Sequence, residues 1–378
     1  MKNHILIAGI ATLMLASCAQ KNQTELTLSG LNPTKFQTVV NDAQTDLYTL
    51  KNKAGMEVCI TNFGGRIVSI MVPDKNGEMK DVVLGFDSIA DYINVPSDFG
   101  ASIGRYANRI NQGKMVLDSD TIQLPKNNFG HCLHGGPKGW QYQVYEANPI
   151  DETTLELTRF SPDGDANFPG NLTAKVLFKL TDDNAIDIKY SATTDKKTVI
   201  NMTNHSYFNL TGEGSGKVLD TYLTIHARDY NPVDEFSIPT GEYAAVEGTP
   251  MDFNKAKKIG QEIEADFQQL KYTGGYDHNY VTDNYAKGSR RTVAVAYNET
   301  SGITMDVISD CPCVQFYAGN FVIDEKGKNG HVYNKREGFC LETQVEPNAV
   351  NVEAFHSPVL EAGEKYQSFT AYKFDVRK

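Results

Sequence analysis

The sequence has no basic cluster, and this absence excludes several classes of partner. Its 378 residues contain 36 Lys and Arg against 47 Asp and Glu, which gives a formal net charge of −11. Such a balance repels nucleic acid and anionic membrane surfaces, so we expect neither as a partner. A phosphorylated or acidic substrate would be repelled as well. The composition therefore favours a neutral small molecule as the substrate.

Cysteine is also scarce, with six residues in the chain. One of them, Cys18, lies near the N-terminus, and the remaining five are an odd number, which argues against a full disulfide framework. Cys311 and Cys313 are too close together for a usual zinc knuckle, and the sequence has no second cysteine pair that could complete a zinc site with them. We expect the five to be mostly buried as small apolar residues. They are Cys59, Cys132, Cys311, Cys313 and Cys340.

The N-terminal apolar run, residues 5–15, is too short to span a bilayer as a stable helix. It follows Lys2 and leads into Leu-Ala-Ser-Cys at Cys18, which is typical of a secretory signal. This ending resembles the bacterial lipobox, in which the cysteine is lipidated and becomes the first mature residue. We expect a lipoprotein signal peptide at residues 1–17, lipidation at Cys18 and a tether over residues 18–34. The protein would be exported and held by acyl chains on a bacterial membrane, facing the periplasm. The alternative is an ordinary signal peptide with an incidental cysteine.

Helical periodicity is nearly absent as well. There is no strand–helix alternation and no glycine-rich nucleotide loop, and only Ile263, Phe267 and Leu270 indicate a short helix. Alternating apolar residues instead predict strands, most clearly at residues 172–180 and 186–192, with a Thr-Asp-Asp-Asn turn between them. Further strands are expected at residues 56–61, 67–72, 222–227, 292–297, 303–308, 314–317, 339–344 and 369–376. Many short strands with regular turns predict an all-β protein, a large antiparallel sandwich or barrel.

His205 and Glu342 are candidates for proton transfer because of where they lie in the sequence. His205 follows a strand-like segment in the polar run Asn-Met-Thr-Asn-His-Ser-Tyr-Phe-Asn-Leu, residues 201–210. Histidine both donates and accepts a proton near neutral pH, although a lone histidine is more often a structural residue. Glu342 lies inside an apolar strand, where a carboxylate is costly without a role or a partner. Burial would raise its pKa from about 4.3 and make it a stronger base; a structural ion pair is the alternative.

Other polar side chains lie at predicted turns and strand ends. Arg109 ends a mostly uncharged run, and its rigid fork of donors suits an oxygen-rich ligand. His134 precedes two glycines, which would bring a ligand close to bare backbone. Asp277 follows a Gly-Gly turn, and Gln315 lies in a strand of aromatic residues. For Arg109 a surface ion pair is the commoner fate, and an Asp in a turn often only caps its own backbone.

Seven short motifs occur in a fixed order along the chain. They are Gly-Arg-Tyr-Ala-Asn-Arg-Ile (104–110), Leu-His-Gly-Gly (133–136), Phe-Pro-Gly-Asn (168–171), Thr-Asn-His-Ser-Tyr-Phe-Asn-Leu (203–210), Gly-Tyr-Asp-His-Asn (275–279), Gln-Phe-Tyr-Ala-Gly-Asn (315–320) and Leu-Glu-Thr-Gln (341–344). In this order they resemble the aldose 1-epimerase, or galactose mutarotase, family. The resemblance extends over roughly residues 35–377, essentially the whole mature chain.

The resemblance implies a fold, a reaction and a role for each matching residue. The fold would be a large antiparallel β-sandwich that occupies residues 35–378 as one domain. His205 corresponds to the general acid and Glu342 to the general base of an isomerase that interconverts α and β anomers of free aldoses such as glucose and galactose. Acid and base on opposite sides of the ring would suffice, without a redox cofactor or a catalytic metal. Sugar-binding positions are expected at Asn108, Arg109, His134, Asp277 and Gln315, with Ser206 and Tyr207 flanking the acid.

Some questions stay open at the level of the sequence. The family usually has Gly-Phe after the His-Gly-Gly loop and a Trp a few residues on. Here Trp140 follows Gly139 and Tyr145 stands where the Trp is expected, so the sugar preference is in doubt. A metal on His131, Cys132 and His134 is not expected, because no third ligand has a familiar spacing, whereas oxygen-rich turns leave room for a structural cation such as Ca²⁺. We expect a monomer.

Three other functions compete with the epimerase. A glycoside hydrolase would use two carboxylates on one sugar, for which Asp277 and Glu342 are candidates. A sugar-phosphate epimerase of the same fold would need a basic clamp that the acidic composition does not provide. A non-catalytic carbohydrate-binding protein would bind aldoses without accelerating their anomerisation.

Overall fold

The computed structural model describes residues 25–377. The predicted signal peptide, Cys18 and the first part of the predicted tether lie outside the described residues. Within residues 25–377, no helix is long and apolar enough to cross a membrane.

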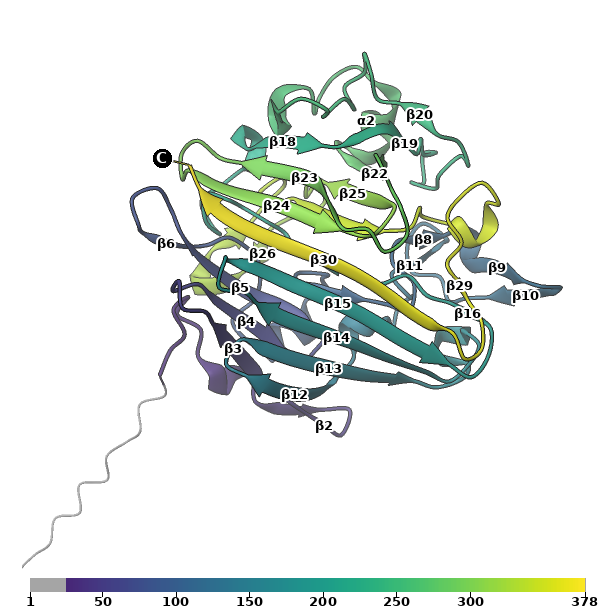
Figure 1. Ribbon diagram of the computed structural model, residues 1–378, viewed down its shortest axis with the longest axis horizontal. Coiled ribbons are helices and arrows are strands. Elements are labelled where there is room, and N and C mark those ends of the chain that lie inside the picture. Colours follow the sequence, from purple (N-terminus) through teal and green to yellow (C-terminus); the bar gives the residue numbers. More distant parts are fainter. Residues whose placement is uncertain (1–24, 378) are drawn as a thin grey trace, which may run out of the picture.

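The largest element is an antiparallel sheet of nine strands, which runs across the front of the molecule (Figure 1). Its strands follow in the spatial order β12 (Glu146–Asp151), β13 (Thr154–Ser161), β14 (Leu172–Leu180), β15 (Ala185–Thr194), β30 (Lys365–Val376), β24 (Ile303–Ser309), β23 (Arg291–Tyr297), β18 (Tyr222–Ile225) and β21 (Lys257–Lys258).

Two smaller antiparallel sheets form the opposite layer. One has the order β20 (Ala244–Ala245), β19 (Ala227–Tyr230), β22 (Asp277–Thr282), β25 (Cys313–Tyr317) and β28 (Cys340–Gln344). The other has the order β3 (Leu47–Lys51), β4 (Glu57–Thr61), β5 (Arg66–Pro73) and β6 (Met79–Asp81).

Short strand pairs and two short helices complete the secondary structure of the described residues. The helices are α1 (Ile89–Asn94) and α2 (Gln268–Thr273). The pairs are β1 (Thr38–Val40) with β2 (Ala43–Thr45), β7 (Ala101–Ile103) with β17 (Thr203–His205), β8 (Arg109–Ile110) with β11 (Cys132–Leu133), β9 (Lys114–Leu117) with β10 (Asp120–Gln123), β16 (Thr198–Val199) with β29 (Val359–Leu360), and β26 (Glu325–Lys326) with β27 (Val332–Tyr333).

The core lies between the two layers, because alternate residues of each strand point the same way. In β14, Val176 and Phe178 are buried, whereas Lys175 and Lys179, which face the other way, are exposed. The same apolar cluster contains Ile60 of β4 as well as members from the five-stranded sheet. One cluster fed from both layers is the core of a sandwich, so the predicted all-β sandwich is confirmed.

Most strands predicted from the alternation are present, and two predictions need correction. The segment 222–227 was predicted as one strand but contributes to two, β18 in the large sheet and β19 in the opposite layer, with His226 between them. The alternation continues through this crossing, so it does not reveal the change of partner. The predicted helix is α2, which starts only at Gln268 because Phe267 is its extended N-cap, and ends at Gly274 with φ +66°.

Lys328 links the loop after β26 to the sheet of β5 and β6. Its side chain is fully buried, and Nζ donates to Asp81 Oδ2 at 2.6 Å and to the carbonyls of Val68 at 2.7 Å and Val83 at 2.9 Å. Replacing it would leave the Asp81 carboxylate buried without a counter-charge. This ion pair therefore tests how far the fold depends on a buried charge.

We expect Lys328→Met to lower the free energy of unfolding by about 3–5 kcal/mol, the cost of breaking a buried pair from one side. Urea unfolding monitored by circular dichroism measures this. The matched control is Lys373→Met, because Lys373 pairs with Asp183 on the surface, where both side chains are exposed. That control should lose no more than about 1 kcal/mol. Equal losses in the two variants would contradict a special role for the buried pair.

Candidate active site

His205 is the last residue of β17, which pairs with β7 so that His205 lies opposite Ala101. The following segment is tied to the five-stranded sheet, because Phe208 and Phe339 exchange backbone hydrogen bonds at 2.7 and 3.0 Å. The imidazole of His205 therefore lies next to the edge of β28. His205 is buried, with 5% of its surface exposed.

Glu342 lies on β28, on the face of the five-stranded sheet that points away from the core. Leu341 on the same strand belongs to the core cluster, so period-two alternation turns Glu342 to the other side. Gln315 on β25 lies directly opposite Glu342 in the register, and Asp277 on β22 follows two pairs away. Gln315 Nε2 donates to Asp277 Oδ1 at 2.6 Å. Three of the predicted residues thus share one polar face.

The structure brings the predicted acid and base together, although these two residues are 137 positions apart in the sequence. His205 Nε2 lies 3.5 Å from Glu342 Oε1, and the Glu342 side chain is 2% exposed. No Lys or Arg within the described range 25–377 pairs with Glu342, so the alternative of a structural ion pair with a cation is not supported. No ring fits between atoms at this separation, which favours an approach of both groups from one side of the sugar over the expected placement on opposite sides.

Burial shifts both groups toward their neutral forms. It raises the pKa of Glu342 well above its usual value, and the negative charges of Asp277 and Asp98 raise it further. Burial lowers the pKa of His205, whereas the charges of Asp98 and Asp277 oppose that shift. A carboxylate with a raised pKa is a stronger base, and an imidazolium with a lowered pKa is a stronger acid.

His134 and Asn108 are held against each other by reciprocal bonds. His134 N donates to the Asn108 carbonyl, and Asn108 N donates to His134 Nδ1, each at 3.1 Å. Because Nδ1 accepts, the proton of the neutral ring is assigned to Nε2. Burial lowers the pKa of His134 to about 3, so the ring stays neutral and presents Nε2–H as a donor. Arg109 follows on β8, and its Nε donates to Asn128 Oδ1 at 3.0 Å.

Tyr207 packs against the ring of the histidine. The Tyr207 ring stacks on the His205 ring with centroids 5.1 Å apart, and His134 meets His205 edge-on at 5.1 Å. Burial raises the pKa of Tyr207 well above its usual value, so the phenol stays neutral. The imidazole of His205 is therefore confined between two rings that carry no charge.

Several buried polar atoms around the pair have no hydrogen-bond partner among residues 25–377. In native proteins nearly all buried polar atoms are satisfied, so each exception needs an explanation. A ligand rich in hydroxyl groups would satisfy such atoms. They are Asp98 Oδ1, Ser206 Oγ, Gln315 Oε1 and Glu342 Oε2.

Sequence reasoning missed two residues that touch this cluster. Asp98 lies in the turn before β7, and its carboxylate lies within 4.8 Å of ring nitrogens of His134 and His205. Nothing in the sequence separates it from an ordinary turn aspartate. Cys340 was interpreted only as a buried apolar residue, but its Sγ lies 3.5 Å from His205 Nδ1. All five described cysteines are buried, as expected, and all five are free.

Ligand-type side chains approach one another in three places, which raises the question of a metal. Two of these groups share His205, with Asp98 and His134 or with Cys340 and Glu342. The group with Cys340 does not favour a metal, because a thiol ligand must lose its proton and burial raises the pKa of Cys340 well above its usual value. The third group is Cys313, Glu346 and His356, where Glu346 already accepts bonds from Tyr243 and His356.

Two residues from the sequence analysis prove to be structural. His131 Nδ1 accepts the Gln112 backbone N–H at 2.9 Å. Trp140 is buried in the core and packs directly on Gly104, where an added Cβ would come within 2.1 Å of its ring.

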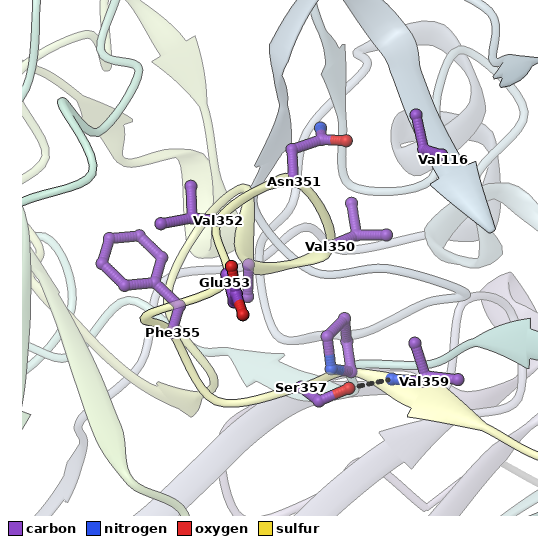
Figure 2. Close-up of a pocket in the computed structure, with 10 residues that line it drawn as sticks. Val116, Val350, Asn351, Val352, Glu353, Phe355, Ser357 and Val359 are labelled. Atoms are coloured by element: carbon purple, nitrogen blue, oxygen red, sulfur yellow. Dashed lines mark hydrogen bonds between the residues drawn. The ribbon is translucent and has the colours of Figure 1, made fainter. Parts of the chain in front are cut away.

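A surface pocket of about 440 Å³ lies in another part of the molecule (Figure 2). It is lined by Val116, by residues 349–353 and by residues 355 and 357–359, and its one charged lining residue is Glu353. None of the candidate residues lines this pocket. We therefore place the chemistry at the His205–Glu342 cluster.

The sequence is similar to known epimerases over most of its length. The family model described as aldose 1-epimerase matches residues 46–373. Galactose mutarotase from Bos taurus is 40% identical over 324 residues, which are 85% of this chain and 92% of the relative. Aldose 1-epimerase from Escherichia coli K12 is 38% identical over 331 residues, which are 87% of this chain and 94% of the relative.

The fold is also similar to solved structures of epimerases. A GalM/aldose epimerase homologue from C. elegans has a TM-score of 0.82 at 29% identity, over 88% of this chain and 100% of that one. Galactose 1-epimerase from Lactobacillus acidophilus has a TM-score of 0.79 at 28% identity, over 90% of this chain and 97% of that one. Sequence and fold lead to the same assignment: the chain belongs to the aldose 1-epimerase family of isomerases.

Proposed function

We propose that His205 and Glu342 are the acid and base with which this aldose 1-epimerase opens and recloses the ring of a free aldose. One observation carries the proposal: Nε2 of His205 and Oε1 of Glu342 lie 3.5 Å apart among buried polar atoms that have no hydrogen-bond partner in residues 25–377. In an aldopyranose, O1 and O5 are both bonded to C1. Two groups this close together can therefore reach both oxygens from one side of the sugar.

Ring opening moves two protons and two bonding pairs of the sugar. Glu342 takes the proton of the O1 hydroxyl, and the electrons of that O–H bond form the C1 carbonyl. The C1–O5 bond breaks, its electron pair goes to O5, and O5 receives the proton of protonated His205. The products are an open-chain aldehyde, a neutral imidazole and a protonated Glu342.

Rotation about C1–C2 then exposes the other face of the aldehyde. O5 attacks C1 while its proton returns to His205, and the carbonyl oxygen takes the proton of Glu342. Both residues regain their starting states, and the sugar leaves as the opposite anomer. The sequence of steps uses no electron acceptor, which agrees with the expectation that no redox cofactor is needed.

The remaining predicted residues are proposed to hold the sugar hydroxyls. His134 offers a fixed Nε2–H donor, and Arg109 offers the guanidinium nitrogens that Asn128 does not engage. Asp277 and Gln315 present a carboxylate and an amide oxygen from neighbouring strands. Asn108 acts on the site through its bonds to His134. Ser206 Oγ is a buried hydroxyl without a partner in residues 25–377, and so is available to the sugar.

We propose neutral aldoses, glucose and galactose among them, as substrates. The formal charge of −11 and the carboxylates of Asp98, Asp277 and Glu342 around the site disfavour a phosphorylated sugar. The relatives named galactose mutarotase support a neutral hexose. We also propose that the protein is exported and lipid-anchored through Cys18, on the strength of the Leu-Ala-Ser-Cys ending.

Replacing either member of the pair should abolish most of the catalysis. We expect Glu342→Gln and His205→Ala each to lower the catalysed rate about 10²–10⁴-fold, the range of acid–base contributions. Polarimetry on freshly dissolved α-galactose measures the rate, and an unchanged melting temperature shows that the variant is folded. Glu156→Gln is the matched control, because Glu156 lies on β13 and pairs with Lys175 at the surface. Wild-type rates in Glu342→Gln would refute the role of the base.

A phosphorylated substrate should be much poorer than its neutral counterpart. We expect kcat/KM for glucose 6-phosphate to be roughly tenfold or more below that for glucose, because the acidic protein repels the anion. Polarimetry at low and high ionic strength compares the two sugars. Salt should narrow the difference, since screening weakens the repulsion. Equal values at low salt would contradict the substrate class.

Lipidation can be tested independently of the enzyme activity. We expect the full-length chain, expressed in a bacterium, to incorporate labelled palmitate and to fractionate with membranes. Cys18→Ser should lose both properties, whereas Cys59→Ser should keep them. A Cys18→Ser variant that still incorporates palmitate would contradict the anchor.

A further inference from the structure

Asp98 is the charged residue next to His205 that the proposed mechanism does not use. Its carboxylate lies within 4.8 Å of ring nitrogens of both His205 and His134, and its Oδ1 is buried without a hydrogen-bond partner in the part of the chain that the structure describes. A buried carboxylate oxygen without a partner is costly unless a charge or a ligand compensates it. The nearby imidazole is the group that can become positively charged.

The turn that carries Asp98 is fixed on two sides. Arg66, fully buried, donates from its guanidinium to the carbonyls of Ser97 and Phe99, each at 2.9 Å. Gly100 N donates to the carbonyl of His205 at 3.0 Å, so the same turn is bonded to the backbone of the histidine itself. The backbone on both sides of Asp98 is therefore held in place next to His205.

We propose that Asp98 is a positioning residue that keeps His205 protonated, as an acid, through the negative charge of its carboxylate. The inference rests on the proposed role of His205. Burial alone favours the neutral imidazole, and a general acid must carry its proton when the sugar arrives. An opposite charge a few ångströms away favours the protonated form.

The other groups around His205 do not supply this charge equally. They come from separate elements: Arg66 on β5, His134 after β11, Tyr207 after β17, Asp277 on β22, and Cys340 and Glu342 on β28. Tyr207, His134 and Cys340 are neutral near pH 7, because burial raises the pKa of the phenol and thiol and lowers that of the imidazole.

Among the charged groups, Asp98 is the one best placed to keep His205 protonated. Arg66 opposes protonation of His205. The Asp277 carboxylate accepts the Gln315 amide at 2.6 Å, so part of its charge is already engaged. Glu342 is itself the base, and burial raises its pKa and so disfavours its charged form. Asp98 Oδ1 has no such engagement within residues 25–377, and after burial its charge is the largest influence on the pKa of His205.

The direction of the pH effect follows from how the negative charge of Asp98 shifts the pKa of each group. Removing the Asp98 charge lowers the pKa of His205, so the acid is lost at a lower pH and the alkaline limb of the kcat/KM profile moves to lower pH. It also lowers the pKa of Glu342, because the Asp98 charge raises it in the folded protein, so the acidic limb moves the same way. The two groups interact, so the apparent pKa values at the two limbs belong to the pair and not to either residue alone. The whole bell-shaped profile should move toward acid.

The test compares wild type with Asp98→Asn, which keeps the size of the side chain and removes its charge. We expect the alkaline limb of kcat/KM for α-galactose to move down by about one pH unit or more. At a pH above the wild-type limb this is about a tenfold loss, whereas activity near the new optimum remains. Asp98→Glu should restore most of the profile. Asp120→Asn, at an exposed position on β10, is the control for a change of net charge.

Nuclear magnetic resonance titration of His205 gives a readout that does not depend on turnover. The resonance is assigned by its loss in His205→Gln, and its pKa should fall in Asp98→Asn by a similar amount. An unchanged His205 pKa overturns the proposal, and so does a higher KM at every pH without movement of the limbs, which would make Asp98 a sugar contact. If the wild type shows no mutarotation, the proposed function fails, and the titration still decides the role of Asp98. Asp98→Ser serves for both measurements if Asp98→Asn does not fold.

Discussion

The site depends on a carboxylate that the fold holds out of water opposite an imidazole. Glu342 is buried, and its one ionic contact within residues 25–377 is His205, 3.5 Å away. In water this carboxylate would be fully ionised at neutral pH and a weak base. Desolvation and the charges of Asp277 and Asp98 raise its pKa, so its affinity for a proton suits a transfer from a sugar hydroxyl.

The sandwich supplies this environment through the alternation of single strands. On β28, Leu341 packs into the core and Glu342 points away from it, so one five-residue strand serves stability and chemistry on opposite faces. On β25, Phe316 and Gln315 divide the same two tasks. A slip of one residue in the register would exchange the two faces and lose both. The antiparallel pairing that fixes the register therefore also fixes the spacing of the polar side chains.

Sequence reasoning identified what is local and missed what depends on how loops dock. Glu342 was recognisable because a carboxylate in an apolar strand is unusual, and His205 because it follows a strand in a polar run. The strands of residues 172–194 were clear because every second residue is apolar. No pattern shows that the turn containing Asp98 lies against His205, since the contact depends on Arg66 and on the backbone of β17. The 3.5 Å separation of acid and base is likewise a product of the packing.

The unpartnered atoms around the pair connect stability with substrate binding. Asp98 Oδ1, Ser206 Oγ, Gln315 Oε1 and Glu342 Oε2 are buried without partners in residues 25–377, and each such atom costs roughly 1–3 kcal/mol of folding free energy. A single core cluster spanning both layers is what allows the fold to carry that cost. A pyranose offers a hydroxyl on nearly every carbon, and its arrival would satisfy atoms that the protein leaves unsatisfied. Hydrogen bonds that do not stabilise the free protein would therefore form when the sugar binds and contribute to its affinity. The same unpartnered atoms that destabilise the free protein would orient the ring.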